Sequence, residues 1–188
     1  GDLLLGVPFT ATSWARELDA DGRPVVLNDG SQGCVPDPWG STNFMPPTFV
    51  PELDLFILTA RETCATYVPE KPIDAPGQSN FGGTVLIDAE QGRGALRALD
   101  IHTGNLVWEF SYPSPTFGGV LSTASGLVFA GDHEGNFMAF SADDGSNLWH
   151  YQTGSRIWGA AAMTFMLEKR QLVLIPSGTT LTAFALPE

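Results

Sequence analysis

The sequence predicts an all-β protein made of short antiparallel strands, and three observations support that prediction. Its 188 residues include 21 Gly and 14 Pro, and most apolar runs are short, as expected for strands joined by tight turns. Apolar and polar residues alternate with a period of two in the clearest runs, such as residues 96–100. The third observation is an internal repeat. No run approaches the ~20 apolar residues that span a bilayer, so we expect no membrane-spanning segment.

The repeat is clearest in two copies that align without gaps. Residues 94–110 read GALRALDIHTGNLVWEF, and residues 135–151 read GNFMAFSADDGSNLWHY. Their tryptophans, Trp108 and Trp149, are 41 residues apart, and a truncated third copy, GTTLTAFAL, occupies residues 178–186. Each full copy predicts a strand, a turn closed by a glycine with positive φ, and a second strand that ends on the tryptophan.

A further hairpin precedes each copy. Its two strands are expected at 48–50 and 55–59, at 121–123 and 127–130, and at 162–165 and 172–175. Two hairpins in about 40 residues make a four-stranded antiparallel blade, and a tryptophan that recurs once per repeat suits sheets stacked around an axis. The sequence therefore predicts part of a β-propeller, an incomplete ring of about three to four blades. An ordinary β-sandwich is the alternative.

The blades are unequal along the partial propeller of residues 1–188. Residues 1–45 read as an irregular lead-in, 46–67 as a hairpin, 68–93 as a connection, and 94–188 as blades with docking motifs. A part of a ring exposes unpaired strand edges and apolar blade faces. We expect the remainder of the same propeller, or a second copy of the chain, to cover them.

The chain is acidic, with 21 Asp and Glu against nine Lys and Arg and a net charge of −12. Such a surface repels phosphate backbones, so we expect no nucleic-acid binding. Two interpretations of the acidity remain open. It confers solubility, or it docks a basic partner such as an electron-carrier protein.

The chain contains two cysteines, Cys34 and Cys64. In an oxidising compartment such a pair forms one disulfide, worth roughly 3–4 kcal/mol in the chain-entropy account. Two unrelated buried thiols are the alternative. The histidines His102, His133 and His150 show no spacing typical of a metal site.

Several motifs follow one another in order along the chain. They are GDLLLGVPF at 1–9, CVP at 34–36, GSTNF at 40–44, and FGG at 117–119 followed by LSTA. With the docking motif AxDxxTGxxxW at 98–108, this ordered set resembles the quinoprotein alcohol dehydrogenases that use pyrroloquinoline quinone (PQQ). The resemblance implies an eight-bladed β-propeller with the cofactor on its central axis.

The resemblance also implies roles for individual residues. Asn43 matches an axial amide that hydrogen-bonds the quinone, and a turn-capping role is its alternative. Phe117 stands where the family has an indole near the cofactor, and Trp158 stands at the matching place one blade later. Core packing is the alternative for both aromatic residues. Cys34 and Cys64 stand where the family often has a disulfide.

The resemblance gives two tryptophans a structural role and implies that the catalytic groups lie outside this chain. Trp108 and Trp149 are docking residues. By resemblance, the catalytic Asp, the ligands of a divalent ion, usually Ca²⁺, and the Arg beside the quinone precede residue 1. No catalytic and no metal-ligating residue is therefore assigned here.

The functional prediction concerns a parent protein. It is a periplasmic or secreted PQQ-dependent dehydrogenase that oxidises an alcohol or aldose and passes electrons to a cytochrome-type acceptor. The present chain is its C-terminal portion, forms one wall of the cofactor pocket, and is inactive alone. The alternative is a non-catalytic periplasmic propeller scaffold that binds peptides or proteins.

Overall fold

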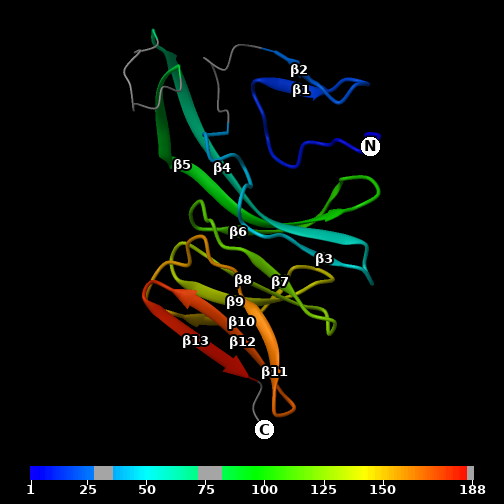
Figure 1. Ribbon diagram of the computed structural model, residues 1–188, viewed down its shortest axis with the longest axis vertical. Coiled ribbons are helices and arrows are strands. Elements are labelled where there is room, and N and C mark those ends of the chain that lie inside the picture. Colours follow the sequence, from blue (N-terminus) through cyan, green and yellow to red (C-terminus); the bar gives the residue numbers. More distant parts are fainter. Residues whose placement is uncertain (28–35, 72–81, 186–188) are drawn as a thin grey trace.

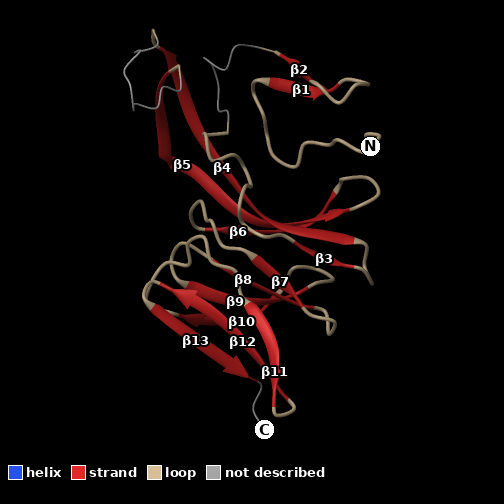
Figure 2. Cartoon of the chain, in the orientation of Figure 1, coloured by secondary structure: helices blue, strands red, loops and turns tan. Residues whose placement is uncertain are grey.

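The computed structural model describes residues 1–27, 36–71 and 82–185, and only the backbone of 89–91. Within these residues the chain forms strands, turns and loops (Figures 1 and 2). No helix in this described part is long and apolar enough to cross a bilayer.

Three antiparallel sheets follow one another along the chain. The first sheet consists of β3 (Thr48–Val50), β4 (Leu55–Pro69), β5 (Gly83–Asp100) and β6 (Leu106–Tyr112). The second consists of β7 (Val120–Ser122), β8 (Leu127–Gly131), β9 (Asn136–Ser141) and β10 (Asn147–Gln152). The third consists of β11 (Met163–Leu167), β12 (Arg170–Ser177) and β13 (Thr180–Ala185). Consecutive strands are neighbours in every sheet, as in the blades of a propeller, so the all-β propeller prediction is confirmed.

The first strands of the sheets lie close together, at what is the axial side of a propeller. The amide of Val120, which begins β7, donates to the carbonyl of Pro46 just before β3, 2.9 Å away. The hydroxyls of Thr48 and Ser122, in the same two strands, lie 2.6 Å apart. These contacts hold the segments that precede β3 and β7 close to each other.

The two docking repeats end their first strand in the same kind of turn. Asp100 accepts hydrogen bonds from the hydroxyl and the amide of Thr103, each 2.8 Å long, and from the amide of His102. These bonds, that of the Thr103 hydroxyl first, lower the pKa of Asp100. Gly104 and Gly145 each have φ +71°, in the left-handed region that favours glycine. The turn chemistry of the sequence repeat is therefore present in both copies.

Apolar side chains fill the spaces between the sheets. A group between the first and second sheets includes Ile57, Leu96 and Phe140, all fully buried. A second group, between the second and third sheets, includes Phe137 and Ile175. The second sheet therefore packs against a neighbouring sheet on both faces, and the first and third sheets each pack against it on one face.

The two repeat tryptophans differ in burial. Trp108 is only 8% exposed, and its indole Nε1 donates to the carbonyl of Ala142 in the second sheet, 2.9 Å away. Trp149 is 39% exposed and packs edge-on against Phe184, with ring centroids 5.1 Å apart.

The expected boundaries differ from the structure in two places. Within the lead-in, β1 (Ala15–Leu18) pairs with β2 (Pro24–Val26) as a small hairpin. Within the expected connection 68–93, strand pairing continues, because β4 and β5 extend past the blade as a two-stranded ribbon (Figure 1). The ribbon contains several β-branched residues, which favour strands, but the Pro, Gly and Asp residues of 72–81 between its strands favour turns and made the pairing hard to predict.

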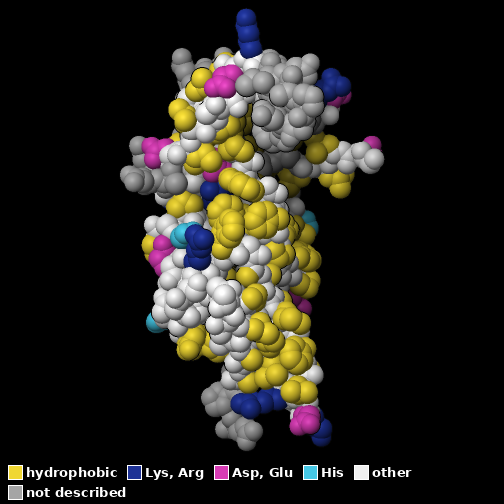
Figure 3. All heavy atoms as spheres, turned by 60° about the vertical axis from the view of Figure 1, so that its left-hand side comes forward, with side chains coloured by type: hydrophobic (Ala, Val, Ile, Leu, Met, Phe, Trp, Pro, Cys, Tyr) yellow, Lys and Arg dark blue, Asp and Glu magenta, His cyan; other side chains and the backbone are white. Residues whose placement is uncertain are grey.

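Apolar side chains also remain exposed on the third sheet. In β11, Met163, Met166 and Leu167 are all more than half exposed. Figure 3 shows hydrophobic side chains gathered along one flank of the molecule. Exposed apolar surface of this extent is typical of a face that another part of a protein covers.

Candidate functional site

Phe117 lies at the centre of an aromatic group at the ends of the inner strands. Phe117 and Trp158 form an isolated parallel β-bridge, and the amide of Gly159 donates to the carbonyl of Phe117, 3.2 Å away. The two rings meet edge to face, with centroids 5.8 Å apart. The structure thus brings together two of the residues that the sequence singled out.

The loop before β3 adds two further rings. Phe44 lies almost parallel to Phe117, at 9° and 6.0 Å between centroids, and Trp39 meets it edge-on at 6.4 Å. We call Trp39, Phe44, Phe117 and Trp158 the aromatic cluster. Its outer rings are about half exposed, with values of 48% for Trp39, 50% for Phe44 and 53% for Trp158. Exposed rings of this kind can stack against or border a flat aromatic ligand.

The cluster forms because its members precede equivalent strands. Phe44, Phe117 and Trp158 come before β3, β7 and β11, the first strands of the three sheets. The inner strands approach one another closely at Gly119, whose amide donates to the carbonyl of Ala160 at 2.7 Å. A Cβ at Gly119 would lie only 2.7 Å from the ring of Pro46, so the Gly-Gly motif permits this approach.

A buried ion pair lies against the cluster. The guanidinium carbon of Arg61 is 4.2 Å from the centroid of the Phe117 ring, a cation–π distance. Arg61 also forms two hydrogen bonds to the carboxylate of Asp37, of 2.8 and 2.9 Å. The central ring of the cluster, Phe117, therefore packs against an arginine whose charge is balanced by Asp37.

Asn43 belongs to the same loop as Trp39 and Phe44. Its side chain is exposed, and its Nδ2 donates to the carbonyl of Trp39, 3.2 Å away. This bond within the loop matches the turn-capping interpretation, and the side-chain oxygen of Asn43 is not used in it. The cofactor-binding role of Asn43 stays a prediction.

Cys64 lies in β4 and is disulfide-bonded. Cys34 lies outside the described residues, so its pairing with Cys64 stays a prediction. In the described part of the chain, no group of three or more His, Cys, Asp or Glu side chains is placed to hold a metal ion.

Sequence reasoning missed four residues at this site: Trp39, Phe44, Asp37 and Arg61. One signal was available for Arg61, which interrupts the apolar run FILTA on the buried face of its strand. Phe44 also had a signal, because it precedes its hairpin as Phe117 and Trp158 precede theirs. The contacts of Trp39 and Asp37 depend on how a loop folds over neighbouring sheets, which local patterns do not reveal.

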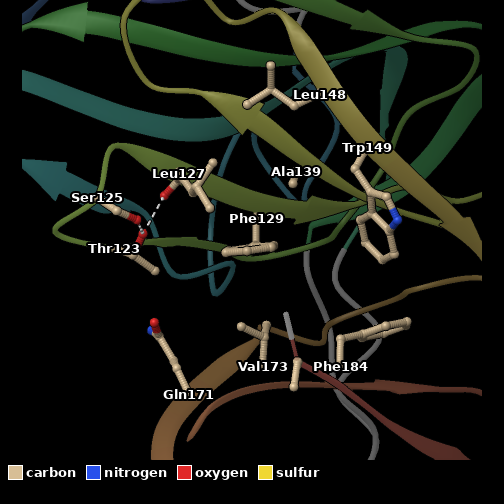
Figure 4. Close-up of a pocket in the computed structure, with 11 residues that line it drawn as sticks. Thr123, Ser125, Leu127, Phe129, Ala139, Leu148, Trp149, Gln171, Val173 and Phe184 are labelled. Carbon is tan, nitrogen blue, oxygen red and sulfur yellow. Dashed lines mark hydrogen bonds between the residues drawn. The ribbon is translucent and has the colours of Figure 1, made fainter. Parts of the chain in front are cut away.

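Apart from the aromatic cluster, a hollow with a volume of about 490 Å³ lies between the second and third sheets. Figure 4 shows Phe129 and Trp149 on one wall and Val173 and Phe184 on the other. Polar groups occur mainly at one end, for example Gln171. Among the described residues, no charged side chain lines this hollow, so it is a mainly apolar gap between blades, unlike the aromatic cluster with its ion pair.

A family model covers more than half of the chain. Residues 68–186 match PQQ_2, a family described as "Outer membrane protein assembly factor BamB". This region contains both docking repeats and the strands from β5 to β13.

Curated relatives and solved structures match almost the entire chain. The quinoprotein alcohol dehydrogenase PedH of Pseudomonas putida is 32% identical over 95% of the chain and 32% of its own length. The quinohemoprotein alcohol dehydrogenase ADH IIB of the same species is 34% identical over 95% of the chain and 27% of its length. The crystal structure of quinohemoprotein alcohol dehydrogenase from Comamonas testosteroni superposes with a TM-score of 0.82 at 30% identity, covering 95% of the chain and 29% of that structure.

The chain spans about 30% of the length of these relatives. The chain therefore belongs to the PQQ_2 family, and nearly all of it is similar to a part of the quinoprotein alcohol dehydrogenases.

Proposed function

We propose that the chain is the C-terminal portion of a periplasmic PQQ-dependent dehydrogenase that oxidises an alcohol or aldose. In this proposal the aromatic cluster forms one wall of the cofactor pocket. The observation that carries it is the meeting of four aromatic side chains, three of them half exposed, at the ends of three inner strands. This is the axial position at which a ligand contacts several blades at once.

The residues present fit a flat, polar-edged aromatic cofactor. Phe44 and Trp158 offer exposed ring surface, and the amide of Asn43 can accept and donate hydrogen bonds at an edge. Arg61 Nε is buried and has no hydrogen-bond partner among the described residues, so an unsatisfied donor lies beside the cluster. When bound, PQQ serves as the acceptor of the hydride removed from the substrate.

The chain's own residues would bind and orient the cofactor and exclude water from one side of it. The metal ligands and the base that removes the alcohol proton would come from other parts of the protein. Ca²⁺ is the metal implied by the sequence resemblance, but relatives also include a lanthanide-dependent methanol dehydrogenase of Methylacidiphilum fumariolicum, 29% identical over 95% of the chain and 31% of its own length. Both metals therefore belong in a test.

A scaffold that binds peptides or proteins is the second candidate, favoured by the description of the matching family model. That match begins at residue 68, after the loop that carries Trp39 and Phe44. The dehydrogenase matches extend over 95% of the chain and so include most of the preceding region. This difference supports the dehydrogenase.

Three curated relatives are named quinohemoproteins, which supports a haem-type electron acceptor for the parent protein. The net charge of −12 supports docking of a basic carrier. Dependence of the electron-transfer rate on ionic strength would test this, because screening weakens electrostatic steering.

The full-length protein, reconstituted with PQQ and either Ca²⁺ or a lanthanide, is expected to reduce an artificial dye when given alcohols or aldoses. Trp158→Ala is expected to weaken PQQ binding. Trp149→Ala is the matched control, because Trp149 is also partly exposed but lies outside the cluster. Bound PQQ with no turnover on any substrate and with either metal would refute the proposal, and specific capture of extended peptides would then favour the scaffold.

A further inference from the structure

The ion pair between Arg61 and Asp37 is buried and geometrically complete. Arg61 Nη1 and Nη2 each bind a different oxygen of Asp37, at 2.8 and 2.9 Å. The two side chains are 5% and 0% exposed. The hydroxyl of Thr63 donates to Asp37 as well, 2.7 Å away. Such a bidentate fork fixes orientation in addition to charge.

Arg61 also holds the loop that precedes β3. Its backbone amide donates to the carbonyl of Ser41 at 2.8 Å, and Nη1 reaches the carbonyl of Gly40 at 3.3 Å. Asp37 accepts from the amide of Trp39, 2.9 Å away. Arg61 therefore binds the loop that carries Trp39 and Phe44 to β4 through both its side chain and its backbone.

The same guanidinium contacts Phe117, which precedes β7 of the next sheet. Arg61 thus joins three parts of the molecule: its own strand, the loop before β3, and the central ring of the aromatic cluster. No other described cation contacts the Phe117 ring.

The pairing of β4 with β5 is irregular beside the ion pair. Glu62 pairs with Arg93 and Cys64 pairs with Asp88, so the register shifts next to Thr63 and the extra residues lie on β5. Arg61 and Thr63 are both buried and both reach Asp37. Bulges re-aim side chains and are common beside functional sites.

Burying two charges is costly, and a buried pair adds little net stability over apolar side chains of similar volume. The presence of this buried pair is better explained by its effect on the positions of the loop and of the Phe117 ring than by a gain in stability. The exposed pair between Arg93 and Glu62 shows the contrast, because the Arg93 side chain is 62% exposed and touches no ring of the cluster.

We propose that Arg61 is a positioning residue, which with Asp37 holds the aromatic cluster in its binding geometry before a ligand arrives. The inference rests on the proposed function for the identity of the ligand, but the arrangement of the cluster can be tested without it. Preorganisation of this kind increases affinity, because the loop and rings lose little freedom on binding.

The decisive variant is Arg61→Lys in the full-length protein, which keeps the positive charge but loses the fork. A second variant combines Asp37→Asn with Arg61→Gln, which leaves no lone buried charge if the single change impairs folding. Arg93→Gln is the matched control, because it removes an exposed arginine from the same strand pair.

The first readout needs no cofactor. Tryptophans labelled with 5-fluorotryptophan give separate ¹⁹F signals, assigned by single Trp→Phe changes. In both Arg61 variants, the signals of Trp39 and Trp158 are expected to shift or broaden, while those of Trp108 and Trp149 stay in place. Arg93→Gln is expected to move none of the four. Unchanged Trp39 and Trp158 signals, or a general shift of all four, would overturn the positioning role.

The second readout is the Kd of PQQ, measured by titration of the metal-loaded protein. Arg61→Lys is expected to raise this Kd about tenfold, with a smaller change in KM for the alcohol. An unchanged Kd, or a KM that rises as much as the Kd, would overturn the inference. If the unsubstituted protein binds no PQQ, the proposed function fails, and the ¹⁹F signals alone decide the role of Arg61.

Discussion

The indole of Trp108 donates a hydrogen bond to the carbonyl oxygen of Ala142, 2.9 Å away, and so ties the first sheet to the second. Both groups are buried, and the bond crosses the interface that the largest apolar group fills. A buried carbonyl that loses its donor pays a desolvation penalty, so this bond matters more than an exposed one.

Trp108→Phe is expected to lower the free energy of unfolding by about 2–4 kcal/mol, because the carbonyl of Ala142 loses its partner and a cavity forms. Trp149→Phe is the control and is expected to cost less than about 1 kcal/mol, because Trp149 is 39% exposed. Urea unfolding of the protein measures both. Equal losses for the two variants would contradict the docking role of Trp108.

Gly145→Ala is expected to destabilise the protein by about 2–4 kcal/mol. A Cβ at this position overlaps the ring of Trp108, and the backbone has φ +71°. Gly104→Ala shares the same φ but meets only the side chain of Val7, so it is expected to cost about 1 kcal/mol. The difference between the two thermal-unfolding results isolates the contact with Trp108, and a Gly104→Ala loss as large as that of Gly145→Ala would contradict it.

Glu62 is expected to make stability depend on pH. Burial alone raises the pKa of its carboxyl, but hydrogen bonds and charge from Arg93 and Arg97 outweigh burial and lower that pKa below its ordinary value of 4.5. The folded state therefore gains stability from Glu62 above about pH 4.5, and loses it as the pH falls through the lowered value.

Glu62→Gln tests this pH dependence. The variant is expected to be less stable than the unsubstituted protein at neutral pH and to approach it in acid, as measured by urea unfolding across the range. Glu52→Gln is a control carboxylate for which no ion pair is found among the described residues. A constant difference between Glu62→Gln and the unsubstituted protein at all pH values would contradict the linkage.

The 188-residue chain by itself is expected to self-associate in a concentration-dependent manner, because β11 exposes Met163 and Leu167. The double change Met163→Glu and Leu167→Glu is expected to reduce the association. Leu106→Glu is the control, since Leu106 is 53% exposed but lies in β6, outside the third sheet. Light scattering after size-exclusion chromatography measures the mass, and a monomer at all concentrations would contradict the expectation.

The architecture of the blades could be predicted from the sequence because it is encoded locally. Alternation, turn glycines and a tryptophan in each copy are properties of neighbouring residues, and the repeat showed them twice. The ribbon formed by β4 and β5 was missed, since its two strands are separated by a segment rich in turn-forming residues. Pairing across such a gap is a tertiary property.

The candidate site was predictable only in part. Phe117 and Trp158 could be aligned as equivalent positions of successive repeats, and the structure brings their rings together. Trp39 lies in a loop outside any repeat, and Asp37 contacts Arg61 across 24 residues of sequence. Neither periodicity nor spacing reveals such a contact.

The aromatic cluster draws its members from segments that precede three different sheets. A molecule bound across it therefore contacts the first, second and third sheets at once. Its binding free energy adds to the stability of their association, by mass action. Loss of that molecule is expected to loosen all three blades together, so the thermal resistance of the whole propeller becomes a measure of how fully the site is occupied.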